Sequence, residues 1–424
     1  MMPWPPPPSN APAAAELGGA GSGPRVSAAP ERARPSGPTP GPQSRPLAAT
    51  QASPGRPAVV IQTSFLGDVI LTTPLLAFLA QHGPVDVVTT PVAAPILARD
   101  PSVRAVIVYD KRGDARGIAG LWATAQALKA RFGLGTTIGD AASRAEHAAG
   151  GNGGTRPDSP APIAYLAQSS VRSGMLALLA GFPERVGFST SVARALYTRT
   201  VPYRADRHHA ERLWRLGALS PNAEPPADAI RPRLYPDASD VHAVDGLLRR
   251  ASHTSEPLIA LAPGSAWGAK RWPGYPALAA ALARRARVVV VGAADDRDLA
   301  AEIGAAVDGA PGTVIDATGA LSILAAAELI RRCAVIVTND SAPQHLASAM
   351  GTPTVTIFGP TVPEFGFGPL APHHAIAGVS GLECRPCDKH GPQECPLGHW
   401  RCMREITVAF VEDLVRQLST PTTS

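Results

Sequence analysis

Runs of apolar and β-branched residues alternate with segments suited to helices along most of this chain. From residue 58 onward, such runs occur at 58–64, 85–90, 105–110, 258–264, 288–292, 314–319 and 334–338. Because helical segments separate the runs, parallel sheets are favoured over hairpins. The pattern therefore predicts an α/β fold.

The stretch from Ala334 to Gly359 shows this pattern most completely. Residues 334–338 lack polar alternation, as expected of a parallel strand buried on both faces. Residues 339–341 can cap a helix, which Gly351 would end before a second strand at 354–358. The stretch therefore predicts a strand, a polar turn, a helix and a further strand.

The polar turn of this stretch is a candidate binding site. In doubly wound sheets, anionic ligands bind where the carboxyl end of a strand opens into a helix N-terminus. Asp340, Ser341 and His345 would line that position. Asp340 also has a simpler interpretation as the helix N-cap, because Asp is among the preferred capping residues. The sequence leaves both interpretations open.

Asp68 ends a short turn, 65–68, between the first predicted strand and an apolar helix. A carboxylate in the first helical turn is stabilised by the helix dipole. Asp68 therefore either stabilises only the helix or is a functional carboxylate at the carboxyl end of the strand.

The second half of the chain opens with PGSAWGAKRWP, residues 263–273. Gly264 and Ser265 would allow close backbone approach to a phosphate, and Lys270 adds a positive charge. The segment lacks the G-K-[ST] sequence that ends a Walker loop. No G-x-G-x-x-G motif follows the first predicted strand of either half of the chain. ATP hydrolysis and nicotinamide or flavin chemistry are therefore not indicated. If this strand neighbours that at 334–338, both loops share one crevice.

The two series of strands and helices predict two Rossmann-like domains facing a cleft. We expect the domains at 58–235 and 236–424, joined by the proline-rich span 221–236. Residues 1–57 hold 15 of the 45 prolines and little that could be buried, so a disordered tail is expected. A glycine-rich low-complexity insert at 136–162 is expected to form a surface loop.

Charge and hydropathy exclude several classes of protein. Residues 1–57 contain five Arg and two Glu, so +3 of the formal +5 belongs to the expected tail. The remaining net charge of +2, on the chain after residue 57, does not indicate a nucleic-acid-binding surface. No window approaches the roughly 20 apolar residues of a transmembrane helix, and the N-terminus lacks the apolar core of a secretory signal. We expect a cytoplasmic protein whose membrane contact is peripheral at most.

Five arginines crowd the end of the first half: Arg185, Arg194, Arg199, Arg204 and Arg207. Scattered arginines are usually solvated, but several near one sheet edge could hold an anionic substrate through bidentate contacts.

Four of the five cysteines cluster late in the chain, at Cys384, Cys387, Cys395 and Cys402. Only the first pair has strong zinc spacing. A structural zinc and reduced thiols both remain open for this cluster. The fifth, Cys333, is expected to be a small core residue.

Four motifs together resemble the lipopolysaccharide heptosyltransferase family, most of all its heptosyltransferase II branch. They are TSFLGDVILTTPLL, PGSAWGAKRWP, TNDSAPQHLASAMGTPTVTIFGPT and CRPCDKHGPQECPLGHWRCM, in the family's order. The resemblance extends from residue 58 to about residue 418. It implies a GT-B glycosyltransferase of family 9 that moves L-glycero-D-manno-heptose, with inversion, from ADP-heptose to the anionic lipopolysaccharide inner core. No metal or other cofactor is implied.

The resemblance also implies roles for individual residues. Asp68 matches the catalytic base, on an N-terminal domain that binds the acceptor. Lys270 matches a lysine that binds the donor diphosphate, and Asp340, Ala342 and His345 match the donor-binding loop. Gly264, Ser265 and Ser341, which the local pattern already suggests, complete the expected substrate-binding residues. Ala342 replaces a family glycine, which leaves the identity of the donor open. A GT-B-like sugar-nucleotide epimerase and a non-catalytic nucleotide-sugar binding protein are the alternatives.

Overall fold

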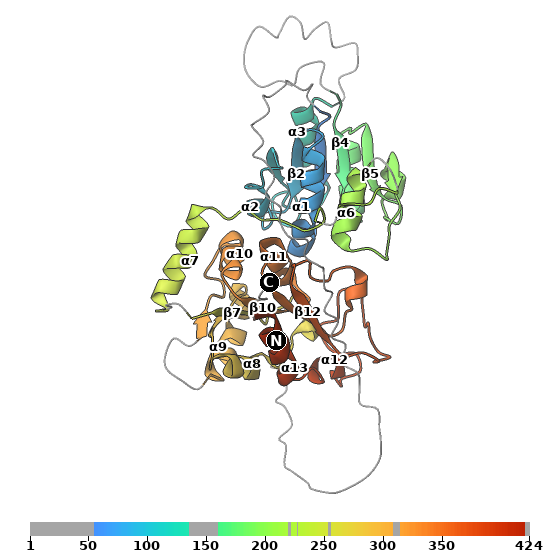
Figure 1. Cartoon of the computed structure of the whole chain (residues 1–424). Coiled ribbons are helices and arrows are strands. Elements are labelled where there is room, and N and C mark those ends of the chain that lie inside the picture. The colour runs from blue at the N-terminus through green and yellow to red at the C-terminus, as the bar shows by residue number, and fades with distance from the viewer. Residues whose placement is uncertain are drawn as a thin grey trace, which may run out of the picture.

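The computed structural model describes residues 55–134, 160–218, 222–226, 228–252, 256–307 and 314–419. These residues form two six-stranded parallel sheets, one above the other in Figure 1. The expected α/β fold with two Rossmann-like domains is confirmed. The tail expected at 1–57 and the insert expected at 136–162 lie outside the described residues, apart from 55–57 and 160–162.

The N-terminal sheet has the strand order β3-β2-β1-β4-β5-β6. Its strands are β1 (Ala58–Ile61), β2 (Val85–Thr89), β3 (Ala105–Val108), β4 (Ile163–Leu166), β5 (Glu184–Phe188) and β6 (Arg199–Val201). Its helices are α1 (Leu66–Ala80), α2 (Ala94–Leu97), α3 (Gly117–Phe132), α5 (Val171–Leu179) and α6 (His209–Gly217). Val60 packs among the residues of α1 and α6, whereas Val59 and Ile61 pack among those of α3 and α5. Both faces of β1 are thus buried, which explains its unbroken apolar run.

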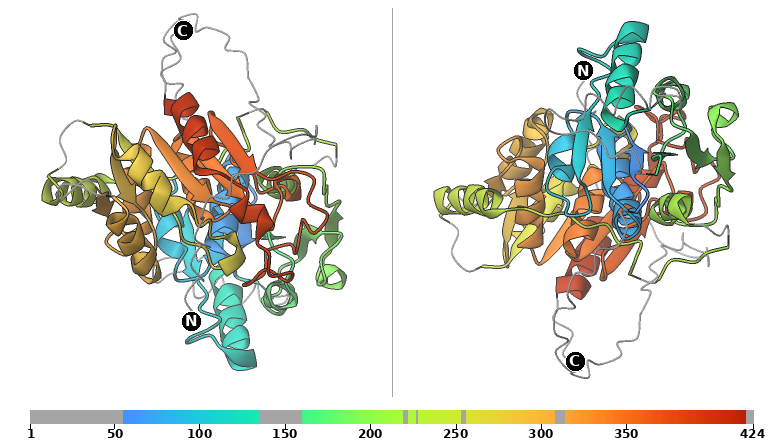
Figure 2. Two further views of the ribbon diagram at one scale, coloured as in Figure 1. Left: turned by 90° about the horizontal axis from the view of Figure 1, so that it is seen from below. Right: turned by 90° about the horizontal axis from the view of Figure 1, so that it is seen from above.

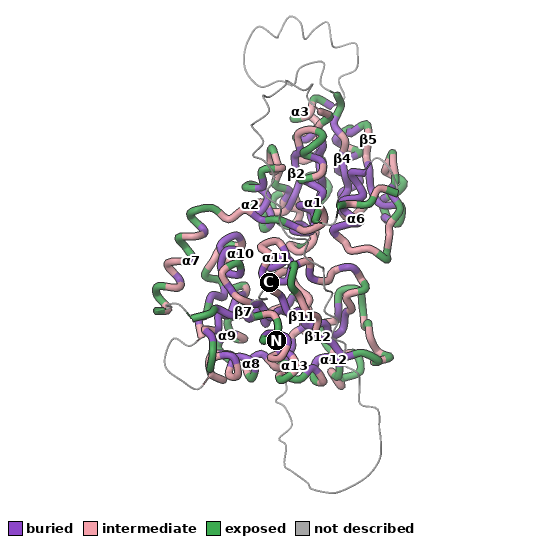
Figure 3. Tube along the Cα trace, viewed as in Figure 1, coloured by how far each residue is buried: buried purple, intermediate pink, exposed green. Residues whose placement is uncertain are grey.

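The C-terminal sheet has the order β12-β11-β10-β7-β8-β9. Its strands are β7 (Leu258–Ala262), β8 (Arg287–Val290), β9 (Val314–Asp316), β10 (Val335–Asn339), β11 (Thr354–Phe358) and β12 (His374–Gly378). Its helices are α7 (Ala238–Arg250), α8 (Tyr275–Leu282), α9 (Arg297–Ala305), α10 (Ile323–Arg331), α11 (Ala342–Met350), α12 (Arg401–Arg404) and α13 (Val408–Ser419). The tube in Figure 3 shows the strands of both sheets as largely buried segments.

Each sheet reverses its strand order at one point. In the N-terminal sheet, β1 lies between β2 and β4, and in the C-terminal sheet, β7 lies between β8 and β10. Ligands of open α/β sheets bind in the crevice beyond such a reversal. Thr338 is paired with Ala262 near the carboxyl ends of β10 and β7. The loops after these two strands are therefore adjacent, as the sequence predicts.

The two domains contact each other through the N-terminal turn of α1 and through α6. Gly67 lies so close to α11 that an added Cβ would come within 2.8 Å of His345 Cδ2. Arg212 Nη1 donates a hydrogen bond to the carbonyl of Phe365 at 3.0 Å, and His209 N donates to the carbonyl of Gly366 at 2.7 Å. Figure 2 shows the two sheets from both ends of this arrangement. The domains are thus joined around the position of Asp68.

Several elements differ from those predicted. Strands β5, β6 and β12 and helices α7, α12 and α13 are not apparent from the hydrophobic pattern, because these elements are short or amphipathic. The first strand ends at Ile61 rather than at residue 64, since Ser64 turns toward Asp68. Arg172 lies in the first turn of α5, whose N-cap Ser170 accepts a hydrogen bond from Ser173 N. In the described part of the chain, no helix is long and apolar enough to cross a membrane.

Candidate active site

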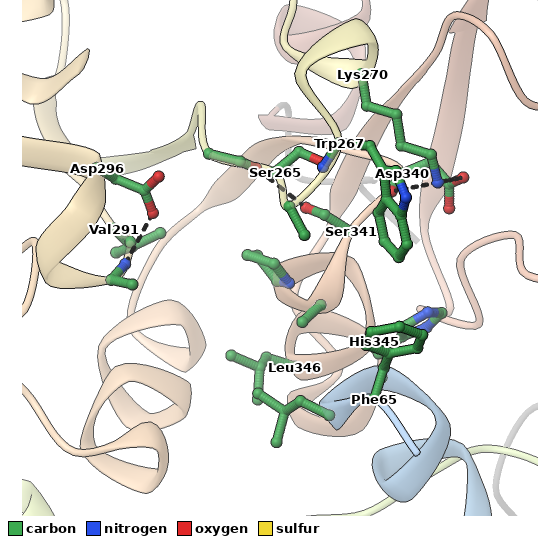
Figure 4. A pocket seen from close by; sticks show the side chains of 18 of the residues that line it. Phe65, Ser265, Trp267, Lys270, Val291, Asp296, Asp340, Ser341, His345 and Leu346 are labelled. Carbon is green, nitrogen blue, oxygen red and sulfur yellow. Dashed lines mark hydrogen bonds and ion pairs between the residues drawn. The ribbon is translucent and has the colours of Figure 1, made fainter. Parts of the chain in front are cut away.

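A cavity of about 720 Å³ lies between the two domains. The loops after β7, β8, β9 and β10, the start of α11 and the first turn of α1 line it (Figure 4). This volume falls within the usual range for small-molecule sites. All eight site residues expected from the sequence line the cavity: Asp68, Gly264, Ser265, Lys270, Asp340, Ser341, Ala342 and His345. The structure thus brings both halves of the predicted site together.

Lys270 and Asp340 form a largely buried ion pair in the cavity wall. Lys270 Nζ donates to Asp340 Oδ2 at 2.6 Å and to the Asp340 carbonyl at 3.1 Å (Figure 4). The same carboxylate accepts hydrogen bonds from Thr361 Oγ1 at 2.7 Å and from Gln344 Nε2 at 3.2 Å. The N-cap of α11 is Ser341. The interpretation of Asp340 as an N-cap is therefore wrong, because its side chain is directed to Lys270 instead.

The far end of the cavity combines carboxylates with an apolar wall. Asp296 Oδ2 accepts a hydrogen bond from Ala293 N at 2.9 Å, and the Asp296 carboxyl group lies directly beside the backbone of Gly264. Apolar side chains line the wall opposite: Leu321, Ile323, Ala326, Ile330 and Leu346. An apolar slot beside carboxylates suits a flat base and the hydroxyl groups of an attached sugar. Asp296 was not predicted as a site residue, although two acids follow soon after the end of β8.

Asp68 faces the cavity from the N-terminal domain. Its Oδ2 accepts a hydrogen bond from Ser64 Oγ at 2.7 Å, and 22% of its side chain remains exposed. Burial raises the pKa of Asp68, against the opposing effects of Ser64, His345, His390 and the Phe65 amide. The effect of the Phe65 amide, which directly precedes α1, is the one expected of an acid that stabilises a first helical turn. Both interpretations of Asp68 are therefore compatible with its geometry, and a raised pKa near a cavity favours chemistry.

Two histidines flank Asp68, one from each domain. His209 Nε2 lies 3.8 Å from Asp68 Oδ1, and its ring packs on Phe367 with centroids 4.7 Å apart. Burial lowers the pKa of His209 to about 3 and that of His345 to about 4. Both imidazoles are thus neutral near pH 7, and the Nδ1 atom of each is buried without a hydrogen-bond partner. A neutral imidazole leaves the negative charge of Asp68 uncompensated.

The cysteine-rich segment, residues 384–402, borders the cavity through Lys389 and His390. All of its cysteines are free thiols, and burial raises the pKa of the Cys402 thiol to about 12. Among the described residues, no group of three or more His, Cys, Asp or Glu side chains is arranged to hold a metal ion. The structural zinc considered for this cluster is therefore not supported. Cys333 is buried, as expected.

The five arginines of the first half are mostly committed to local contacts. Arg185 donates to the carbonyls of Leu196 and Phe182, and Arg204 pairs with Asp206 at 2.9 Å. Arg199 and Arg207 also have acidic neighbours within 4 Å. These contacts argue against the suggestion that the arginines form an anion site, because four of the five guanidinium groups are already engaged.

Two Rossmann-like sheets that enclose one cleft, with a nucleotide-sized cavity against the C-terminal sheet, define the GT-B class of glycosyltransferase folds. The sequence profile of glycosyltransferase family 9 (heptosyltransferase) matches residues 160–400, which is more than half of the chain. The chain belongs to this family.

Individual relatives agree with this assignment. Lipopolysaccharide heptosyltransferase 2 of Escherichia coli is 29% identical over 216 residues, which are 48% of this chain and 61% of that relative. The chain thus spans somewhat under two thirds of this relative. The structure of E. coli ADP-heptose lipopolysaccharide heptosyltransferase II shares the fold with a TM-score of 0.64 and 23% identity, over 85% of this chain and 98% of that one. An E. coli heptosyltransferase solved with ADP has a TM-score of 0.59 and 18% identity, over 85% and 99% of the two chains.

Proposed function

We propose that this protein is an inverting glycosyltransferase that moves L-glycero-D-manno-heptose from ADP-heptose to the lipopolysaccharide inner core. One observation carries the proposal: Asp68 of the N-terminal domain and the Lys270–Asp340 pair of the C-terminal domain line the same cavity. A carboxylate and a cation facing each other across a cleft are what proton removal and departure of a diphosphate require.

The donor is ADP-heptose in this proposal. The apolar wall and Asp296 would hold the adenosine, and the loop Gly264–Ser265 would lie against the diphosphate. Support comes from the E. coli relative, whose structure contains ADP, and from the names of the matched heptosyltransferases. Ala342 adds only a methyl group to the first turn of α11, where it lines the cavity.

Transfer would proceed in one displacement. The Asp68 carboxylate takes the proton of an acceptor hydroxyl as the oxygen attacks the anomeric carbon of the heptose. The bond between that carbon and the diphosphate oxygen breaks at the same time, and ADP leaves with the electron pair. Lys270 and the N-terminal amides of α11 stabilise the charge that develops on the diphosphate. Contact between the domains around Asp68 excludes water during this step.

The acceptor is an anionic lipopolysaccharide-core precursor bound to the N-terminal domain at a membrane surface. Lys111 lies in the loop after β3 and donates to the carbonyl of Thr63, in the loop after β1, at 2.6 Å. Burial and the charges of Arg112 and Arg172 lower the pKa of Lys111. Three neighbouring cations near the loop after β1 would attract an anionic acceptor.

Incubating the protein with ADP-heptose, in the presence and absence of a lipid A–Kdo acceptor, tests the proposal. Mass spectrometry of the lipid and measurement of released ADP should both show transfer that requires acceptor. A new nucleotide-sugar formed without acceptor would indicate an epimerase instead. Binding of ADP-heptose with neither product would indicate a binding protein.

A further inference from the structure

The cysteine-rich segment 384–402 packs against the turn that carries Lys270. Ala269 N donates to the carbonyl of Pro392 at 3.2 Å, and Gly268 N donates to Gln393 Oε1 at 3.0 Å. Gln393 Nε2 in turn donates to the carbonyl of Ala266 at 2.9 Å. A Cβ at Gly268 would come within 2.4 Å of the Gln393 carbonyl oxygen, so this close approach requires glycine. The two segments therefore form one wall of the cavity.

Aromatic rings extend this wall across the cleft. The rings of Trp267 and His390 are stacked, with centroids 5.4 Å apart and an interplanar angle of 9°. Phe65 of the N-terminal domain meets the Trp267 ring edge-on, with centroids 5.3 Å apart (Figure 4). The centroids of the Phe65 and His390 rings are 6.0 Å apart. Since Phe65 is three residues from Asp68, the rings fix the segment beside the point of transfer. Lys389, next to His390, is held at the cavity by this stack.

The charges around the cavity make Lys389 distinctive. The lining includes four carboxylates and three cations, the cations being Lys270, Arg271 and Lys389. Lys270 is neutralised by Asp340, and Arg271 donates two hydrogen bonds to the Ser265 carbonyl. Lys389 is exposed, and it has neither an ion pair nor a hydrogen bond to any described residue. Among the described cations of this lining, Lys389 is therefore the one whose ammonium group makes no contact that a diphosphate would have to share or displace.

We propose that Lys389 is a donor-binding residue that contacts the diphosphate of the nucleotide-sugar, and that the stacked Trp267 and His390 rings hold it in place. This inference rests on the proposed function, since it assumes an ADP-linked donor. It assigns the cysteine-rich segment a role as one wall of the donor site. The free thiols fit that role because they form hydrogen bonds inside the segment. Cys387 Sγ donates to the Cys384 carbonyl at 3.2 Å, and Trp400 N donates to Cys395 Sγ at 3.4 Å.

Calorimetric titration with ADP and with adenosine tests the inference on the full chain. Lys389→Ala should weaken ADP binding about tenfold, as expected for loss of one charge-assisted contact, and Lys389→Arg should restore most of it. Adenosine affinity should not change in either variant, because adenosine carries no phosphate. Lys129→Ala, on α3 and outside the cavity, is the matched control and should bind ADP like the wild type.

A second pair of variants tests the supporting rings. His390→Ala should weaken ADP binding several-fold, whereas His390→Phe preserves the stacked ring and should retain near wild-type affinity. If Lys389→Ala binds ADP within twofold of the wild type, the inference is overturned and the proposed function stands. If the wild-type chain binds neither ADP nor adenosine, the proposed function fails and the inference fails with it.

Discussion

Lys270 Nζ lies 2.6 Å from Asp340 Oδ2, and the two side chains are only 7% and 11% exposed. The cation assigned to the donor diphosphate is therefore already engaged by a carboxylate. Such a pair fixes the orientation of the Lys270 ammonium group at the cavity, and a diphosphate would join the pair rather than replace it.

Lys270→Ala should have two separable effects. Removing the cation leaves the Asp340 carboxylate buried without its ion-pair partner, which should lower the free energy of unfolding by about 3–5 kcal/mol. The double variant Lys270→Ala/Asp340→Asn should recover part of this loss in denaturant titrations, since no buried charge remains. ADP affinity should fall in both variants. Unchanged ADP affinity in the folded double variant would remove Lys270 from the nucleotide site.

Arg212→Ala should loosen the contact between the domains. The Arg212 guanidinium donates to the Phe365 carbonyl across the cleft at 3.0 Å and lies over the Tyr203 ring at 4.8 Å from its centroid. Its loss should widen the distribution of distances between spin labels placed on the two domains. Turnover should fall by about tenfold or more, because misplacement of the reacting groups by about 1 Å is costly.

The matched control is Arg185→Ala. Arg185 also donates to backbone carbonyls, those of Leu196 and Phe182, but both lie within the N-terminal domain. The Arg185→Ala variant should have a lower thermal midpoint of unfolding but unchanged distances between the domains. Equal distance distributions for the two variants would argue against a role for Arg212 in holding the domains together.

His208 should make the stability of the protein sensitive to acid. Its Nδ1 accepts from Ala210 N at 3.1 Å, and its Nε2 lies 3.0 Å from the Gly368 carbonyl, so only the neutral ring satisfies both contacts. Burial lowers the pKa of His208 to about 4. The unfolded chain, with a histidine pKa near 6.5, therefore binds more protons than the folded chain between these values.

The thermal midpoint should accordingly fall as the pH decreases from 6.5 toward 4. His209 and His345 contribute in the same direction, since burial lowers the pKa of both. In His208→Asn, where the amide retains a capping oxygen, the slope of midpoint against pH should be shallower. An unchanged slope in this variant would show that His208 titrates normally in the folded protein.

The sequence predicted the parts of the site that follow from periodicity and local motifs. Lys270 and Asp340 each follow a buried strand, and the observed pairing of β7 with β10 meets the condition under which both loops share the crevice where strand order reverses. Asp68 was predicted in the same way, from the helix turn that contains it. These residues carry a local signal because strand, turn and helix are contiguous in the chain.

Other site residues carry no such signal. His209 lies beside Asp68 only because α6 packs on α1, and Lys389 reaches the cavity only through the contact of Gln393 with Gly268. The cysteine spacing suggested zinc, whereas the part of this segment that borders the site is the Lys389–His390 pair between the thiols. These positions depend on tertiary packing, which the hydrophobic pattern does not encode residue by residue.

Ser64→Ala should move the pH dependence of transfer. Burial raises the pKa of Asp68, and the hydrogen bond from Ser64 Oγ opposes that increase. Without the hydroxyl, the pKa of Asp68 should rise further, so the acidic limb of kcat/KM should shift to higher pH. A profile that does not shift would mean that another group controls the limb.

The most direct test of the account is turnover by Asp68→Asn, measured as heptose transfer from ADP-heptose to the lipid acceptor. The amide preserves the size of the side chain and removes the proton acceptor, so turnover should fall by roughly 10²–10⁴-fold with ADP affinity unchanged. Asp110→Asn changes a carboxylate outside the cavity that, among the described residues, accepts hydrogen bonds from Arg112 N and Gly113 N, and it should leave turnover intact. If Asp68→Asn instead loses only about 0.3–1 kcal/mol of stability and retains turnover within a few-fold of wild type, Asp68 stabilises a helix and is not the base.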